Sequence, residues 1–246
     1  VELESGWSIM GYLHLNCYDA TDMMAPIIDE VIIMKDESGN VYWPIFGLNS
    51  IGDMCPSKGY QIKTENNVTF NYSSGGRFGF DDNNMEQKTI YYQKAKNTGN
   101  NMTIGIPITS WESMPMIGDE ISAYDKSGQL IGSTPFNGNH IALTVWGDDL
   151  TTDNKDGLSI GEEVTFKLWS HEMNTESTLV VTKWDKGSGR YTLNGISIVS
   201  SIFTDNTRFE KAIINIVDLL GRESTNKGFQ LHIYDDGTVE KKYVIK

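Results

Sequence analysis

Short runs of alternating apolar and polar residues, separated by clusters of Gly, Asn and Asp, recur along almost the whole chain. A side-chain period of two is typical of half-buried β-strands, and these runs are rich in β-branched and aromatic residues. They predict strands at residues 7–15, 31–35, 41–43, 60–64, 89–93, 102–108, 120–124, 130–132, 141–146, 164–169, 178–183 and 196–201. Only residues 20–30 fit a helix, and Pro26 limits that helix to one or two turns.

Turn residues join several of these runs into hairpins. Gly39 lies between IIMK and VYW, Gly128 lies between ISAY and QLIG, and Gly237 lies between the last two of three strands predicted at 212–217, 229–234 and 239–245. We therefore predict an all-β fold with two β-sandwich-like modules, at residues 1–72 and 101–203. A loop-rich connection with one strand is expected at 73–100, and a short three-stranded unit at 204–246.

Composition excludes some classes of partner. The 246 residues carry 20 Lys and Arg against 33 Asp and Glu, a net charge of −13. Phosphate backbones repel such a chain, so we expect no nucleic-acid binding. No run approaches the roughly 18–20 apolar residues of a membrane span. The opening VELESGWSIMG has neither a basic region nor an initiator Met, so we expect a piece of a longer chain.

The residue types that carry catalysis are scattered. The four histidines, at positions 14, 140, 171 and 232, form no pair at metal-ligand spacing. His171 and Glu172 begin like the zinc protease signature, but position 175 is Thr and no helix is predicted there. Phosphate-binding glycine loops and nucleophile elbows are also missing from the sequence. We expect no catalytic site.

One loop concentrates the ligands that hard cations prefer. Asp148, Asp149, Asp153 and Asp156 fall within nine residues of WGDDLTTDNKDGL. Calcium takes about 6–8 oxygen ligands from such loops, although this spacing differs from that of an EF-hand. The alternative is a solvated loop in which Asp and Asn shape turns. Six tryptophans offer a second hypothesis, stacking platforms for a glycan, although strand tryptophans more often belong to a core.

The last 36 residues carry a specific motif. Ile214-Asn-Ile-Val-Asp218-Leu-Leu-Gly221-Arg222-Glu223 is followed by Gly228, a strand ending at Tyr234, the turn Asp235-Asp236-Gly237 and a basic strand that contains Lys241. This pattern resembles the C-terminal sorting domain of Bacteroidota proteins exported by the type IX secretion system. The YPNP segment that opens longer sorting domains is absent here. Upstream segments such as GWSIMGY and EVIIMKDESGNVYWP are similar to modules of large Bacteroidota surface proteins.

The resemblance implies a function and a set of partners. The type IX translocon and its outer-membrane shuttle protein would recognise the C-terminal strands, and a sortase-like peptidase would replace the signal with an anionic lipopolysaccharide. We assign recognition to the following residues: Asp218, Gly221, Arg222, Glu223, Gly228, Tyr234, Asp236, Gly237 and Lys241. Secretion to the outer-membrane cell surface also favours a disulfide between Cys17 and Cys55 over two buried thiols.

The sequence thus predicts the non-catalytic C-terminal region of a secreted surface protein. Two alternatives stay open: a calcium-dependent adhesive or glycan-binding β module, and a subunit of a surface fibre that pairs with neighbouring subunits.

Overall fold

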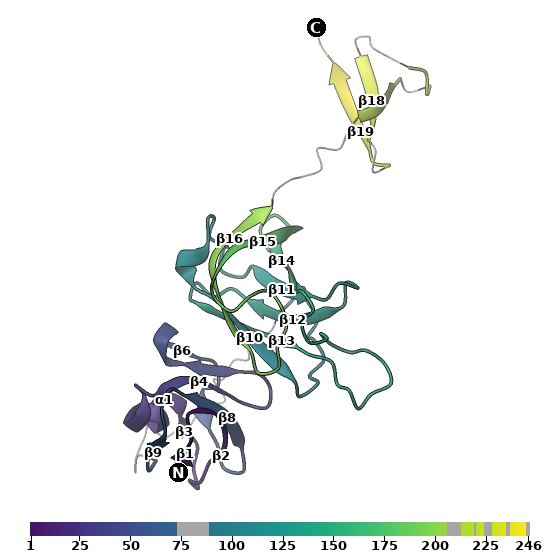
Figure 1. Cartoon of the computed structure of the whole chain (residues 1–246). Coiled ribbons are helices and arrows are strands. Elements are labelled where there is room, and N and C mark those ends of the chain that lie inside the picture. The colour runs from purple at the N-terminus through teal and green to yellow at the C-terminus, as the bar shows by residue number, and fades with distance from the viewer. Residues whose placement is uncertain (73–88, 206–212, 219, 224–227, 235–236, 245–246) are drawn as a thin grey trace. The chain divides into compact units, whose positions relative to one another are not determined.

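The computed structural model describes residues 1–72, 89–205, 213–218, 220–223, 228–234 and 237–244 (Figure 1). Strands dominate these residues, so the all-β prediction is confirmed. Contacts divide the chain into two units, Val1–Thr204 and Asp205–Lys246. No helix among the described residues is long and apolar enough to cross a bilayer.

The first module is built around a five-stranded antiparallel sheet. Its strands lie in the order β2 (Gly6–Gly11), β8 (Gly59–Thr64), β4 (Val31–Lys35), β5 (Val41–Trp43) and β6 (Leu48–Asn49). Two small pairs join β1 (Glu2–Leu3) to β9 (Val68–Thr69) and β3 (Tyr18–Asp19) to β7 (Asp53–Met54). Helix α1 (Ala20–Met24) and the 3-10 helix η1 (Ala25–Ile27) follow β3.

The short helix follows from its local sequence. The carboxylate of Asp19 accepts a hydrogen bond of 2.7 Å from the amide of Thr21, which caps the first turn. Pro26 has no amide hydrogen for the α-helical bond, and the chain continues as η1 instead. The expected limit of one or two turns therefore agrees with the structure.

Both faces of the five-stranded sheet are covered. One face, with Met10, Met34 and Ile62, packs on α1 in the core of the first module. The other face, with Ile33 and Trp43, packs against the second module. A sheet covered on both faces loses the clean apolar and polar alternation of a solvated sheet, which explains the run VIIMK in β4.

The second module is one seven-stranded sheet. Its order is β12 (Leu130–Pro135), β11 (Glu120–Tyr124), β14 (Thr165–Ser170), β15 (Thr175–Lys186), β16 (Ile196–Asp205), β10 (Asn101–Ile106) and β13 (Ile141–Trp146). The two terminal strands, β12 and β13, approach each other. A Cβ added to Gly132 would lie 2.4 Å from the carbonyl oxygen of Thr144. The sheet thus curls around one core, and the sandwich detail of the prediction is not confirmed.

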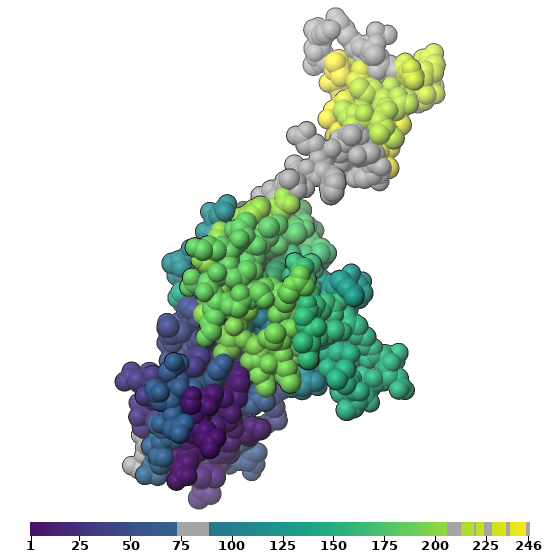
Figure 2. Space-filling model, in the orientation of Figure 1, coloured from purple at the N-terminus to yellow at the C-terminus, as the bar shows by residue number. Residues whose placement is uncertain are grey.

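The two modules are packed tightly against each other. The ring of Trp43 is 1% exposed and lies against Gly105, where a Cβ would come within 2.9 Å of the indole. The Thr144 hydroxyl donates a hydrogen bond of 2.6 Å to the carbonyl oxygen of Gly39. In Figure 2 the purple-to-blue first module and the teal-to-green second module form one continuous body. The 3-10 helices η2 (Pro44–Phe46) and η3 (Ile108–Ser110) complete this unit.

A lysine is buried at this contact. Lys35 is 1% exposed, and its ammonium group donates a hydrogen bond of 3.0 Å to the side-chain oxygen of Asn101. Its nitrogen also lies 5.0 Å from the centre of the Trp7 ring. Burial, together with the nearby charge of Lys63, lowers the pKa of Lys35 to about 7.

The predicted strand at residues 89–93 is wrong. The backbone amides of Ile90, Tyr91 and Tyr92 donate to the carboxylate of Glu120, at distances of 2.5–3.1 Å. A carboxylate that accepts hydrogen bonds from successive backbone amides uses the N–H groups that would otherwise pair with a neighbouring strand. The ring of Tyr91 instead stacks on Trp169 with centroids 3.6 Å apart.

In the first module, Cys17 and Cys55 form a disulfide beside the β3–β7 pair.

Candidate functional site

The C-terminal unit contains a three-stranded antiparallel sheet. β18 (Gly228–Tyr234) lies between β17 (Ile213–Val217) and β19 (Val239–Val244). Residues 205–246 hold seven Lys and Arg and seven Asp and Glu, so the whole net charge of −13 lies in residues 1–204. The unit that carries the predicted recognition residues is therefore neutral, and two of its five lysines lie in β19.

Four of the predicted recognition residues meet in one turn after β17. The carboxylate of Asp218 accepts hydrogen bonds from the amides of Leu220 and Arg222, at 2.8 and 3.0 Å. The guanidinium of Arg222 donates to the same carboxylate at 2.9 Å, and Glu223 forms a bridge to Val217. Gly221 has φ +79°, a left-handed conformation that glycine adopts without steric cost. The motif therefore closes on itself as a structural turn.

This turn also fixes the charge of Asp218. Hydrogen bonds from the amide and the guanidinium of Arg222 and from the amide of Leu220 favour the ionised carboxylate, and they lower the pKa of Asp218. The side chain of Arg222 is 72% exposed, so one edge of its guanidinium faces solvent while another is bonded to Asp218. The turn thus presents a cation at the surface in a fixed orientation.

The other predicted residues lie apart from this turn. Gly228 begins β18 with φ +114°, and Gly237, with φ +78°, lies in the hairpin between β18 and β19. Tyr234 ends β18, where its hydroxyl donates to Glu240 at 2.8 Å. Lys241 lies on the other face of the sheet from Tyr234, where Leu231 is its cross-strand partner. Asp236 lies outside the described residues, so the structure brings the predicted set together only in part.

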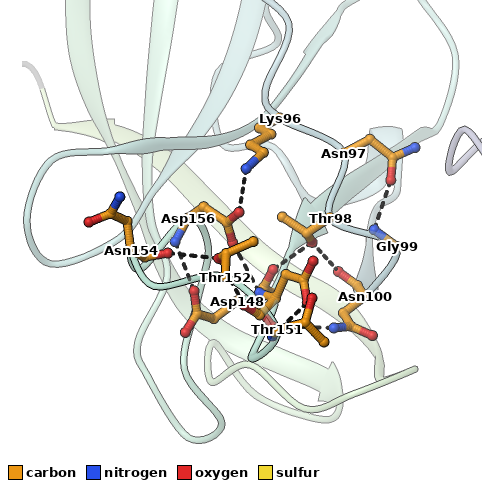
Figure 3. A network of polar contacts seen from close by, with 12 residues as sticks. Lys96, Asn97, Thr98, Gly99, Asn100, Asp148, Thr151, Thr152, Asn154 and Asp156 are labelled. Carbon is orange, nitrogen blue, oxygen red and sulfur yellow. Dashed lines mark hydrogen bonds and ion pairs between the residues drawn. The ribbon is translucent and has the colours of Figure 1, made fainter.

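The acidic loop of the second module is held by its own backbone and by a lysine (Figure 3). Asp148 and Asp156 face each other, and each carboxylate accepts an amide hydrogen bond from the other side of the loop, at 2.8 and 3.0 Å. Asp156 also pairs with Lys96, and Asp149 accepts from the amide and hydroxyl of Thr151. Asp153 is exposed at the tip.

These contacts account for most of the acidic loop without a ligand. Hydrogen bonds from Lys96 and from the amide of Asp149 lower the pKa of Asp156. Within the described ranges, no group of three or more His, Cys, Asp or Glu side chains is placed to hold a metal ion. Calcium binding at Asp148, Asp149, Asp153 and Asp156 stays an untested prediction.

Sequence reasoning missed the lysines that stabilise these loops. Lys155 pairs with Asp125 at 2.8 Å and with Glu162 at 2.9 Å. Burial raises the pKa of Asp125, but hydrogen bonds from Lys155, Ser127 and Gln129 outweigh it and lower this pKa to about 2. Lys96 lies 60 residues before Asp156, and no local pattern pairs positions so far apart.

The histidines occupy separate places in the structure. His14 packs among the rings of Tyr12, Tyr18 and Tyr72. His140 accepts a hydrogen bond of 3.3 Å from the amide of Ile108, and His232 lies 3.2 Å from the side-chain oxygen of Gln230. These three side chains therefore take part in packing or polar contacts at separate places in the structure.

A groove of about 1140 Å³ opens where the two modules meet. Its walls contain the rings of Phe46, His140 and Trp146 together with amide and hydroxyl side chains. The asparagines that line it are Asn40, Asn49, Asn137 and Asn139. Rings and amides are the groups that hold hydroxyl-rich ligands in protein grooves.

Comparison of the chain with family models, with curated proteins and with solved structures returned no match. The functional argument therefore depends on the residues and geometry described above.

Proposed function

We propose that this chain is the non-catalytic C-terminal region of a secreted cell-surface protein, and that residues 205–246 direct its export through the type IX secretion system. In this proposal the translocon and its shuttle protein recognise the C-terminal sheet. A sortase-like peptidase then attaches the cargo to the surface. The two modules of the first unit carry the exported domain away from the attachment point.

The observation that carries this proposal is the turn at Asp218–Arg222. The residues of the sorting motif are adjacent in sequence, and they are also bonded to one another within a unit separate from the rest of the chain. A signal that a translocon reads on many cargoes must have a structure that does not depend on the cargo. A self-closed turn on a separate sheet has that property.

Export of a reporter tests the proposal. A fluorescent protein is fused to the N-terminus of the full chain and expressed in a type IX-competent host, beside the same reporter with an authentic sorting domain. We expect surface fluorescence for the full chain and periplasmic retention when residues 205–246 are removed. The double variant Gly221→Trp with Arg222→Glu should also be retained. If the full chain stays periplasmic while the authentic domain exports the reporter, the proposal is wrong.

The groove between the modules favours a second candidate function, binding of a surface glycan. Its rings and amide side chains match the needs of a sugar, which presents both apolar ring faces and hydroxyls. Calorimetric titration of the full chain with a panel of soluble oligosaccharides tests this candidate. An oligosaccharide that binds in the groove should bind more weakly to His140→Ala. His171 lies outside the groove, so His171→Ala is the matched control and should keep the affinity of the parent chain.

A further inference from the structure

The two faces of the C-terminal sheet differ in character. On one face, the hydroxyl of Tyr234 donates to Glu240 at 2.8 Å and accepts from Lys242 at 3.3 Å. Gln230 and His232 contact each other on the same face. Tyr234 and Gln230 are only 8% and 5% exposed, and the exposed side chains of Glu240 and Lys242 are bonded to Tyr234, so the polar groups of this face have partners within the sheet.

The other face is apolar and open. We call it the aromatic face, and it consists of Phe229, Leu231, Ile233, Val239, Lys241 and Tyr243. Phe229, Val239 and Tyr243 are 49%, 55% and 61% exposed. The rings of Phe229 and Tyr243 lie 4.8 Å apart across the two strands. Such cross-strand aromatic pairs help to hold a sheet together, but here both residues remain largely accessible to solvent.

One charge lies at the centre of the aromatic face. The nitrogen of Lys241 lies 4.4 Å from the centre of the Phe229 ring. Among the described residues no carboxylate pairs with Lys241, whereas its neighbour Lys242 lies 3.3 Å from Glu240 on the polar face. Within the described part of the sheet, the aromatic face thus carries a cation without a paired carboxylate, beside exposed rings.

This combination is typical of a protein-binding surface. Aromatic residues at the centre of a small apolar patch are typical hot spots of protein interfaces, and a charge beside them fixes the orientation of a partner of opposite charge. A sheet of three strands is also marginally stable alone and gains from packing on another surface. The exposed rings that the first argument needs lie on the aromatic face, whereas Tyr234, Glu240 and Lys242 on the polar face are bonded to one another.

We propose that the aromatic face is the surface on which a partner protein docks, and that this partner presents an apolar patch with a carboxylate opposite Lys241. The inference rests on the proposed export function, in which the partner belongs to the secretion machinery. To the export proposal it adds which face of the sheet the partner binds and which chemical groups the partner must present. The rings supply buried apolar area, and Lys241 orients the contact through an ion pair that the rings shield from water.

Matched variants of the full-chain reporter fusion test this inference. Lys241→Gln and Tyr243→Thr alter the aromatic face, whereas Lys242→Gln removes a neighbouring charge from the polar face. We expect each aromatic-face variant to lower the fraction of reporter found on the cell surface at least about tenfold, the loss of affinity typical of removing a single hot-spot residue. Lys242→Gln should export like the parent chain. Amide exchange in β18 should be unchanged in all three, which shows that the sheet still folds.

The outcomes separate this inference from the proposed function. A parent chain that is never exported contradicts the export proposal itself. A parent chain that is exported together with all three variants overturns only the assignment of the aromatic face. A separate experiment mixes the full chain with anionic phosphatidylglycerol vesicles and sediments the vesicles. Sedimentation with the vesicles that is lost in Lys241→Gln and Tyr243→Thr would assign the face to a lipid surface and overturn a protein partner.

Discussion

The two units of this chain differ in how much apolar core they build. In Val1–Thr204 buried apolar side chains fill two module cores and the contact between the modules, although others such as Ile45 are exposed. Among the described residues of Asp205–Lys246 only Val217 and Tyr234 are buried apolar residues, and Phe229 and Tyr243 are 49% and 61% exposed. The first unit also carries the whole net charge of −13, and the second is neutral. Charge repulsion between the first units of separate molecules favours solubility. The neutral C-terminal sheet can approach a partner without net charge repulsion of its own.

The comparison teaches that the units differ in what stabilises them. Packing inside the first unit makes its two modules a single rigid support. The second unit lacks a core of comparable size among its described residues, and its sheet depends on the β17–β18 and β18–β19 ladders and on the turns that join its strands. Variants of the first unit should therefore change the global stability, and variants of the second should change local structure and recognition.

The largest effect is expected for Trp43→Ala. Trp43 is 1% exposed and fills the contact between the modules, so its removal leaves a cavity and should lower the free energy of unfolding by about 3–5 kcal/mol. Calorimetry should show one transition for the parent chain's first unit. Ile45→Ala, at an 80% exposed position nearby, is the control and should change little. An unchanged melting temperature in Trp43→Ala would show that the modules do not support each other.

The disulfide should contribute the next largest effect. Cys17 and Cys55 are 38 residues apart, and opening such a loop destabilises a protein by about 2–4 kcal/mol in the chain-entropy account. We expect the Cys17→Ser, Cys55→Ser double variant to melt earlier than the parent chain and to lose its response to a reductant. Amide exchange in β18 should not change, because the disulfide lies in the other unit. Equal melting with and without reductant in the parent chain would contradict this.

Lys35 predicts how stability depends on pH. Its pKa falls from 10.5 to about 7 on folding because of burial, so the folded state binds fewer protons than the unfolded state between these values. The penalty for the buried charge is complete below pH 7 and is relieved as the pH rises towards 10.5. Stability should therefore rise with pH in this window, with a slope of up to about 1.4 kcal/mol per pH unit.

The groups that face Lys35 define the control for this measurement. Asn101 accepts its hydrogen bond, Trp7 lies beside its nitrogen, and Lys63 supplies the neighbouring charge. The double variant Lys35→Met with Asn101→Leu removes both buried polar groups, and denaturant titrations from pH 7 to 10 should then give a flatter profile. A slope that persists in this variant would assign the pH dependence to other groups.

Local patterns predicted strands well where neighbours in sequence are also neighbours in the sheet. The bounds of β4, β5 and β13 coincide with the predictions, because β-branched residues and a glycine turn define each of them. Distant partners decided the failures. Glu120 accepts hydrogen bonds from the amides of residues 90–92, and Lys96 pairs with an aspartate 60 residues away. None of these pairings leaves a local signature in the sequence.

The candidate site shows the same division. The turn at Asp218–Arg222 was predictable, because its residues are contiguous and glycine marks its left-handed position. The difference between the two faces of the C-terminal sheet was not predicted, although the alternation of a strand places the adjacent Lys241 and Lys242 on opposite faces. Only the cross-strand register places one beside Phe229 and the other beside Glu240.

The smallest effect is expected for Gly221→Ala, and it sharpens the contrast between the units. Gly221 has φ +79° and open space around its Cα, so a methyl group adds only backbone strain, about 1 kcal/mol. Gly118 in the first unit has φ +97° and equally open space, which makes Gly118→Ala a matched control. Because the added strain is similar, amide exchange in β17, next to Gly221, should accelerate about fivefold in Gly221→Ala, whereas exchange in β11, which begins two residues after Gly118, should hardly change in Gly118→Ala. Gly221→Asn should restore the parent rate, since Asn tolerates the left-handed region, and exchange that is slow in both alanine variants would mean that the second unit is as strongly stabilised as the first.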